Sequence, residues 1–218
     1  IYSSKFMEDN DALEILLDGI DTNLIGTPRK ISFKTGCRKN LWNKNCISIG
    51  LSAGFLEPLE STSLYLIQAG ISKFITLFPT AEISDLVRNE YNKQMLKEFY
   101  QVRDFIILHY KATERNDSDF WNYCRNMSVP DSLKNKMELF KDAGRVFRYE
   151  DELFSKPSWI AVCLGQNLIP KSIDPIVSSL PLKQVQHSLD SMQNAMKHAA
   201  KKMKTHEEFI DFYNARSY

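Results

Sequence analysis

A glycine-rich turn that carries two carboxylates and leads into an apolar run is the strongest local constraint on how this chain folds. The turn reads Gly50-Leu-Ser-Ala-Gly-Phe-Leu-Glu-Pro-Leu-Glu-Ser-Thr-Ser63, and it lies between the β-branched segment Cys46–Ile49 and the apolar run Leu64–Ile71. This order predicts a strand, a turn and a helix between residue 45 and about residue 78. Such a turn exposes the free backbone N–H groups and positive dipole end of the helix, which favour an anion.

The two carboxylates of the turn, Glu57 and Glu60, receive different interpretations. Spacing alone also fits an ordinary helix after a strand, capped within Ser61–Ser63, because a loose glycine pattern is a weak signal. Glu60, however, places negative charge beside an anion site, where a carboxylate can accept a proton or hold a substrate cation. Glu57 stands directly before Pro58 and is expected to be a structural hydrogen-bond acceptor in a tight turn.

Composition and charge match an ordinary soluble globular protein. Of the 218 residues, 43% are hydrophobic and 25% are charged, and a net charge of +1 gives no electrostatic reason to expect binding to nucleic acid or an anionic membrane. No apolar run approaches the length of a membrane-spanning helix. The four cysteines are far apart and lack metal-like spacing, so we expect reduced, mostly buried thiols in a cytoplasmic protein.

Strand signals come early in the chain and helix signals dominate after residue 84, which predicts an α+β fold that is mainly α. Short strands are expected at Ile1–Phe6, Lys30–Thr35 and Cys46–Ile49. Residues 158–164 fit either a helix or a strand. Amphipathic spacing and capping residues predict helices at Asp9–Leu17, Asp85–His109, Ser118–Met127, from Pro130–Ser132 through Phe140, at Leu182–Lys202 and at Glu207–Ala215. Within the longest of these, Asp104–Tyr110 is apolar on more than one face and is expected to be buried.

Four other features admit a functional interpretation beside a structural one. Arg38 and Trp42 can line a ligand cleft, although a solvated loop charge and a core aromatic residue are the default expectation. His109 ends an apolar helix and is expected to be a hydrogen-bonded core histidine and not a base. The aromatic residues at 120, 121 and 123 can enclose an indole, but an aromatic helix face is more often core, which is the expectation adopted for them.

The wording of the turn closely resembles the corresponding motif of flavin-dependent tryptophan halogenases. Further segments are similar to members of that family in the same order along the chain, so that the resemblance covers essentially all of it. These segments are Thr35–Asn45, Arg103–Tyr110, Asp117–Trp121, Cys124–Met127, Gly144–Phe147 and Pro157–Trp159.

The resemblance implies an enzyme that uses FADH2, O2 and chloride or bromide to halogenate tryptophan, indole or a related electron-rich arene, with a separate flavin reductase as its partner. By the same resemblance, Glu60 is the catalytic residue that acts near the arene. The backbone N–H groups of Thr62 and Ser63 bind the halide, and Leu51 and Leu64 contact the flavin. Some tryptophan-specific members carry Gly at the position of Ser63, which keeps the backbone donor and changes the space at the halide site.

Two signatures that the family implies are absent from these 218 residues, namely GxGxxG and W-x-W-x-I-P. The resemblance places both upstream, together with the lysine that relays the halogen, so no lysine of this chain is assigned that role. The first residue is not Met, and we expect a C-terminal portion of a FAD-dependent monooxygenase-like fold, inactive without its N-terminal FAD-binding portion. Residues 1–80 would complete the FAD module, and residues 81–218 would form a mostly helical substrate-side region.

Two alternatives stay open at this point. A related flavin monooxygenase-like protein could oxygenate an arene without halogenating it. A helical chain of this kind could also be a non-catalytic binding module, with the turn serving only as a helix cap.

Overall fold

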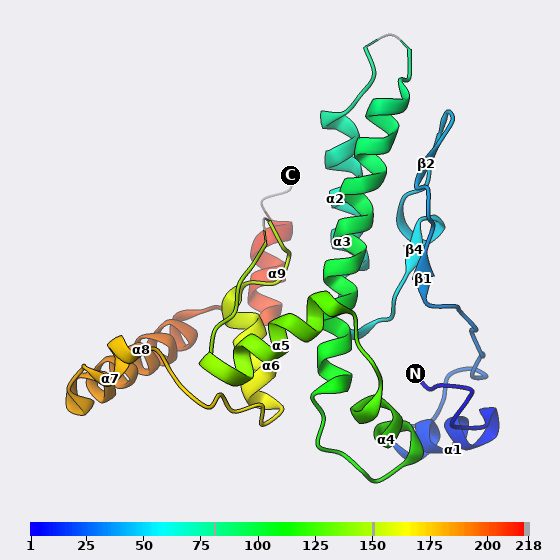
Figure 1. The fold of residues 1–218 in the computed structure, drawn as a ribbon. Helices are drawn as coiled ribbons and strands as arrows, with labels where there is room; N and C mark the ends of the chain where they lie inside the picture. The colour runs from blue at the N-terminus through cyan, green and yellow to red at the C-terminus, as the bar shows by residue number, and fades with distance from the viewer. Residues whose placement is uncertain (81, 150, 216–218) are drawn as a thin grey trace. The chain divides into compact units, whose positions relative to one another are not determined.

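The computed structural model describes residues 1–80, 82–149 and 151–215, which belong to two compact units, Ile1–Lys171 and Ser172–Tyr218. Both are built mainly from helices, and the strands are short (Figure 1). Each unit is described by itself below. The expected division of the chain at residue 80 concerns the modules of a longer enzyme and stays a prediction.

The long helix α3 (Asp85–Lys111) is the scaffold of the first unit, and its 27 residues span about 40 Å. Ser84 begins it as the N-cap, because its side chain accepts a hydrogen bond from the backbone N–H of Val87 at 3.2 Å. Helix α2 (Ser63–Thr76) packs along α3 (Figure 1). Both helices lie where the spacing of apolar residues predicts them.

Two apolar cores share α3 between them. The first joins the N-terminal part of α3 to α2 and to the segment that precedes it, with Trp42, Leu66 and Tyr91 among its buried members. The second joins the C-terminal part of α3 to helices α5 (Asp131–Ala143) and α6 (Lys156–Gly165). The prediction that Asp104–Tyr110 is buried on more than one face is confirmed for three of its residues, since Ile106 belongs to the first core and Phe105 and Leu108 belong to the second.

The strands pair as two antiparallel ladders of two residues each. Gly36–Cys37 (β1) pairs with Gly54–Phe55 (β4), and Trp42–Asn43 (β2) pairs with Cys46–Ile47 (β3). Position 54 requires glycine, because a Cβ there would lie 2.6 Å from the Cα of Cys37 on the facing strand. This close approach fixes the start of the carboxylate-bearing turn against β1.

Two predicted strands do not form, and a third is shorter than expected. Ile1–Phe6 and Lys30–Thr35 contain no strand, and Lys30–Thr35 is exposed throughout, so its polar–apolar alternation has no core to face. The strand expected at Cys46–Ile49 is limited to Cys46–Ile47, and Cys46 is exposed. Alternation over five or six residues is a weak predictor when no neighbouring strand supplies a partner.

The ambiguous stretch at residues 158–164 is helical and belongs to α6. Ser155 caps this helix by accepting the N–H of Ser158 at 3.3 Å, and Pro157 occupies its first turn, where a missing N–H has no consequence. The predicted helices near residues 9, 118 and 131 also form. Their bounds are Asp9–Asp18 (α1), Asp119–Asn126 (α4) and Asp131–Ala143 (α5).

Within 172–215, the described part of the second unit, the elements are the helices Pro175–Ser178 (α7), Leu182–Lys202 (α8) and His206–Asn214 (α9). Thr205 and Glu208 form a capping box at the start of α9, which satisfies two backbone N–H groups reciprocally. None of the described residues of these helices is buried. The helices predicted at residues 182–202 and 207–215 are confirmed to within one residue at each end.

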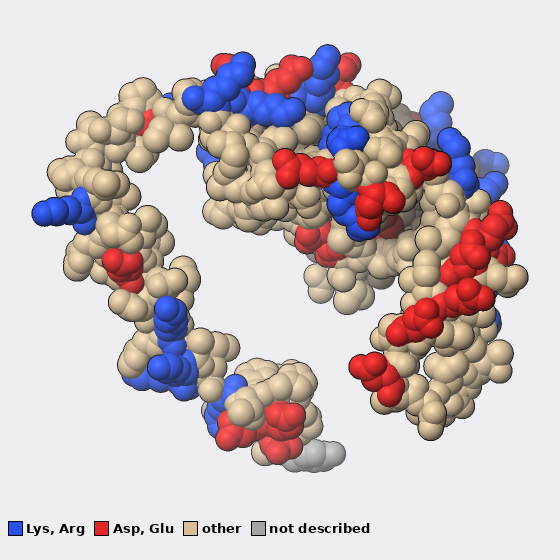
Figure 2. All heavy atoms as spheres, turned by 90° about the horizontal axis from the view of Figure 1, so that it is seen from below, with Lys and Arg blue, Asp and Glu red and all other residues tan. Residues whose placement is uncertain are grey.

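Surface charge is mixed in sign, as the 28 basic and 27 acidic residues of the chain imply (Figure 2). Side chains of both signs occur on the face shown, in places grouped by sign. Among the described residues, no helix combines the length and the apolar character needed to cross a bilayer.

Candidate active site

The turn that precedes α2 is held in an unusual backbone conformation at its second carboxylate. Two short 3-10 turns, η1 (Gly50–Ser52) and η2 (Leu59–Ser61), flank β4 and lead into the helix. Glu60 has φ 66° and ψ −1°, and Ser61 follows with φ 51°. Left-handed conformations at two successive residues other than glycine cost on the order of 1–3 kcal/mol each. They persist only where surrounding contacts determine them, which marks this turn as a functional candidate.

Two consecutive residues of α3 hold the two carboxylates of the turn. The Nε2 of His109 lies 3.0 Å from Oε1 of Glu60, and the hydroxyl of Tyr110 donates to Oε2 of Glu57 at 2.8 Å. The side chain of Glu60 remains 35% exposed, whereas that of His109 is only 18% exposed. His109 therefore holds Oε1 of Glu60, while the carboxylate remains partly exposed to solvent.

Glu57 behaves as the structural acceptor that its position before Pro58 predicts. Its Oε1 is buried and has no hydrogen-bond partner among the residues that the structure describes, so the bond from Tyr110 is its one described support. Burial, together with this hydrogen bond and the charge of Glu57, raises the pKa of Tyr110 well above its ordinary value. Tyr110 thus stays a protonated donor wherever the fold is intact.

Arg38 supports the start of the turn, a role that its position in a basic loop did not suggest. Its backbone N–H donates to the carbonyl of Ala53 at 2.8 Å, and its Nε donates to the carbonyl of Ser52 at 2.6 Å. Trp42 is a core residue with 2% exposure, as expected. The side-chain amide of Asn92 on α3 bonds both the N–H and the carbonyl of Trp42, at 2.7 and 2.9 Å.

The halide-binding residues expected from the family resemblance stand at the start of α2. Thr62 is its N-cap and is buried, with 4% exposure, and Ser63 is its first helical residue. No side chain caps this end of the helix. Because the first N–H groups of a helix have no partner within it, those of the first turn remain available to an anion.

The two expected flavin contacts, Leu51 and Leu64, are exposed, at 75% and 73% respectively. They lie on elements that touch each other, since the Cβ position of Gly50 in η1 is 3.4 Å from the side chain of Ile67 in α2. Large exposed apolar side chains next to a helix N-terminus provide what one side of a flavin site needs, namely an apolar surface and backbone donors. The described residues therefore fit part of such a site.

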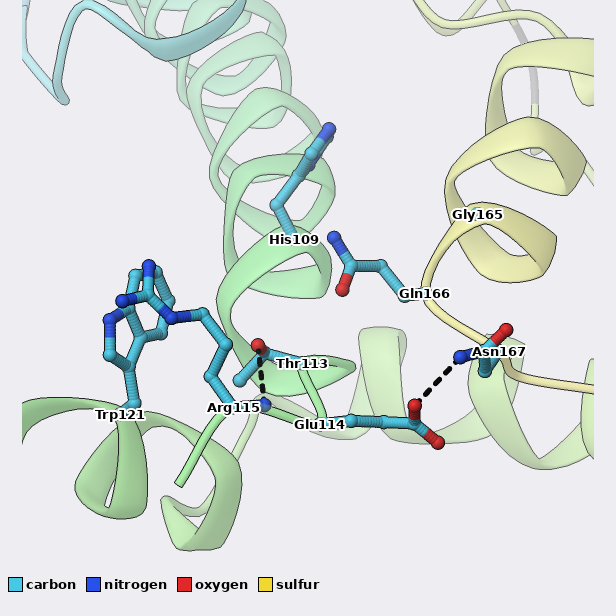
Figure 3. A pocket seen from close by; sticks show the side chains of 8 residues that line it. All are labelled: His109, Thr113, Glu114, Arg115, Trp121, Gly165, Gln166 and Asn167. Carbon is cyan, nitrogen blue, oxygen red and sulfur yellow. Dashed lines mark hydrogen bonds between the residues drawn. The ribbon is translucent and has the colours of Figure 1, made fainter. Parts of the chain in front are cut away.

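A cavity of about 260 Å³ adjoins His109 at the C-terminal end of α3 (Figure 3). It is lined by His109, by Thr113–Arg115 after α3, by Trp121 of α4 and by Gly165–Asn167 at the end of α6. The amide of Asn167 donates to Oε2 of Glu114 at 2.7 Å, which joins two of its walls. His109 is thus shared between this cavity and the carboxylate of Glu60.

The aromatic helix α4 differs from the expectation of a core face. Cys124 is its buried residue, whereas Tyr123 is 51% exposed and Trp121 lines the cavity. The guanidinium of Arg115 lies over the Trp121 ring at 4.4 Å from the centroid. Arg115 also forms a bidentate ion pair with the carboxylate of Asp117, which holds the guanidinium in place and lowers the pKa of Asp117 below its usual value. The cavity wall is therefore partly aromatic and partly charged.

Comparison with known proteins assigns the chain to a family. The family model described as tryptophan halogenase matches residues 1–182. The chain belongs to the tryptophan halogenase family. The resemblance carried by the turn and by the segments after it is thereby confirmed. One curated member, the tryptophan 6-halogenase SttH of Streptomyces toxytricini, is 35% identical over 143 residues, which cover 64% of this chain and 27% of SttH.

Solved structures of flavin-dependent halogenases share the fold of this family member. Xcc4156 from Xanthomonas campestris is 38% identical with a TM-score of 0.93, over 97% of this chain and 43% of Xcc4156. BrvH from Brevundimonas sp. BAL3 is 40% identical with a TM-score of 0.90, over 96% of this chain and 43% of BrvH. The predicted mainly helical α+β class is confirmed, and the chain spans less than half the length of these relatives.

Proposed function

We propose that this chain is the C-terminal part of an FADH2-dependent halogenase that acts on tryptophan, indole or a related electron-rich arene. The observation that carries the proposal is the carboxylate of Glu60, held in a left-handed turn by α3 and placed just before the N-terminus of α2. The family membership and the halogenase structures support the same reaction.

The start of α2 would bind the halide and one face of the flavin. Backbone N–H groups of Thr62 and Ser63 are placed to hold chloride or bromide, because the helix dipole favours an anion there. Leu51 and Leu64 present the exposed apolar surface that a flavin ring would cover. Bound FADH2, with O2 and halide, would supply the oxidised halogen that the arene attacks.

Glu60 would act on the arene itself. Substitution of an aromatic hydrogen by halogen requires that the ring carbon lose its proton while the electron pair returns to the ring, and a positioned carboxylate can take that proton. The oxygen of Glu60 that His109 does not contact is the one proposed to face the ring. The cavity beside His109, with Trp121 in its wall, is the proposed place for part of the arene.

The whole enzyme would need components beyond these residues. We propose that a separate flavin reductase supplies FADH2, and that a further FAD-binding portion of the same protein, matching the length of the relatives, completes the flavin site. The substrate would be a small aromatic molecule and the enzyme cytoplasmic. The chain alone is expected to be inactive.

Replacing Glu60→Gln in the full-length enzyme tests the assignment. We expect FAD binding to persist and halogenation to fall by about 10²–10⁴-fold, which is the usual contribution of a positioned acid or base. Glu138 lies on α5 in an exposed ion pair with Lys134. Glu138→Gln is therefore a matched carboxylate-to-amide control that should keep wild-type turnover. Wild-type turnover in Glu60→Gln would remove this carboxylate from the mechanism.

Mass spectrometry of products separates halogenation from oxygenation. With bromide present, the proposal expects a brominated arene. Hydroxylated product without any brominated product would instead identify an oxygenating flavin enzyme. Absence of flavin binding by the full-length protein would favour a non-catalytic binding module.

A further inference from the structure

The two ring nitrogens of His109 have different partners, and together these restrict where its protons can lie. Nδ1 is 2.9 Å from the carbonyl oxygen of Phe105, one helical turn earlier in α3. A carbonyl oxygen only accepts hydrogen bonds, so Nδ1 is the donor and carries a proton. In a neutral ring this leaves Nε2 as a bare acceptor, and that is the nitrogen that faces Oε1 of Glu60 at 3.0 Å.

A bare Nε2 and a carboxylate oxygen would repel each other at 3.0 Å, because both are acceptors. The contact therefore requires a proton between the two atoms. Either the imidazolium of His109 donates to the carboxylate, or a protonated Glu60 donates to the neutral ring. In both cases the orientation of one carboxylate oxygen is fixed by a charge-assisted or strong neutral hydrogen bond.

The ring that makes this contact is itself held rigidly. Its edge packs against the Phe105 ring, with centroids 5.0 Å apart and planes at 83°. Phe105 is 1% exposed and belongs to the second core, so the support for His109 reaches into the interior of the first unit. The next residue, Tyr110, donates a hydrogen bond to Glu57 of the same turn. Helix α3 therefore contacts both carboxylates of the turn in which Glu60 is left-handed.

We propose that His109 is a positioning residue for Glu60, and this inference rests on the proposed catalytic role of that carboxylate. By engaging Oε1 through Nε2, His109 directs the second oxygen of Glu60 outward, toward the position of the reacting ring. It also keeps Glu60 in place while the turn remains in its left-handed conformation. Misplacement of a reacting group by about 1 Å can lower turnover on the order of 10²-fold.

Two substitutions of His109 in the full-length enzyme separate positioning from mere packing. His109→Leu removes the donor and keeps most of the bulk, so kcat for halogenation should fall by about 10–100-fold while the affinity for FAD stays within about twofold. His109→Gln places an amide N–H near the position of Nε2, so it should recover kcat to within a few fold of wild type. Wild-type kcat in His109→Leu, or no recovery in His109→Gln, would overturn the inference.

A spectroscopic measurement on the 218-residue chain tests the contact without any catalysis. Imidazole ¹⁵N signals of His109 should change in Glu60→Gln, because the group that faces Nε2 changes from a carboxylate to an amide. The exposed histidines His187 and His198 serve as internal controls and should not respond. Unchanged His109 signals would refute the contact, and with it the positioning role.

The two measurements also distinguish failure of the inference from failure of the proposed function. If the His109 signals respond but Glu60→Gln retains full halogenation, the contact is real and the catalytic role of Glu60 is wrong, so the positioning role falls with it. If Glu60→Gln is inactive and His109→Leu is fully active, the function stands and only the inference is lost. In the double variant, loss of His109 should add little to loss of Glu60, since the two act as a unit.

Discussion

Removing the hydroxyl of Tyr110 should destabilise the first unit more than removing an equivalent hydroxyl elsewhere. Tyr110→Phe keeps the ring, which packs near Phe120 and Trp121 with centroids 6.2 and 6.1 Å away. It deletes the 2.8 Å bond to Glu57, whose other oxygen is already buried without a described partner. The substitution would therefore leave the carboxylate of half-buried Glu57, one oxygen of which is buried, with no described hydrogen bond.

Tyr65→Phe is a matched comparison. Tyr65 donates to Glu98 at 2.7 Å, a bond of nearly the same length and chemistry. Glu98, however, also pairs with Lys73 at 3.0 Å and keeps that partner when the hydroxyl is lost. A hydrogen bond to a charged group contributes about 1.5–3 kcal/mol, and stranding the acceptor moves the loss toward the upper end of that range. We expect losses of about 3 kcal/mol for Tyr110→Phe and about 1.5 kcal/mol for Tyr65→Phe.

Urea unfolding followed by tryptophan fluorescence measures this difference in the relevant unit. All three tryptophans, Trp42, Trp121 and Trp159, lie within Ile1–Lys171, so the signal reports the first unit alone. With a slope of about 2 kcal/mol per molar urea, the midpoint should fall by roughly 1.5 M for Tyr110→Phe and by roughly half that for Tyr65→Phe. Equal shifts for the two variants would show that Glu57 is supported by something other than Tyr110.

Two further predictions concern buried ionisable groups outside the turn. Burial raises the pKa of Cys163 to about 11, so at pH 8 only about one Cys163 thiol in a thousand is ionised. A thiol reagent should label exposed Cys46 quickly and Cys163 only on unfolding. Equal labelling rates would contradict the burial of Cys163. The buried ion pair of Lys136 and Glu152, with N–O distances of 2.6 and 2.7 Å, predicts that Lys136→Met costs about 3–5 kcal/mol in urea unfolding. Adding Glu152→Gln should restore much of that loss, and no restoration would show that packing of Lys136 over Trp159 dominates.

Helices were predictable from the sequence because their signals are local. Ser84 and Ser118 cap α3 and α4 through bonds to residues three positions away, and such pairs are visible in the sequence itself. Strands depend on partners instead. The ladder between β1 and β4 joins Gly36 to Phe55, and nothing near Lys30–Thr35 indicated that this segment would lack a partner.

The candidate site was predictable only in part, for the same physical reason. The resemblance of one sequence motif to the family identified Glu60 and the start of α2. The groups that hold the turn come from elsewhere: His109 lies 49 residues after Glu60, and Tyr110 lies 53 residues after Glu57. Residues this far apart carry no shared periodicity, so His109 was expected to be only a hydrogen-bonded core histidine.

The placement of these contacts on α3 explains how a strained turn can be precise. Left-handed geometry at Glu60 and Ser61 is intrinsically unfavourable, so the turn alone would relax and carry its carboxylate with it. Helix α3 prevents this because its N-terminal and C-terminal parts pack into two different cores, and shifting the helix would disrupt both. His109 contacts Glu60 and Tyr110 contacts Glu57, so both carboxylates are held by the same rigid helix. A carboxylate with the catalytic role proposed for Glu60 can be held in position in this way without a rigid loop, because the long helix α3 holds it.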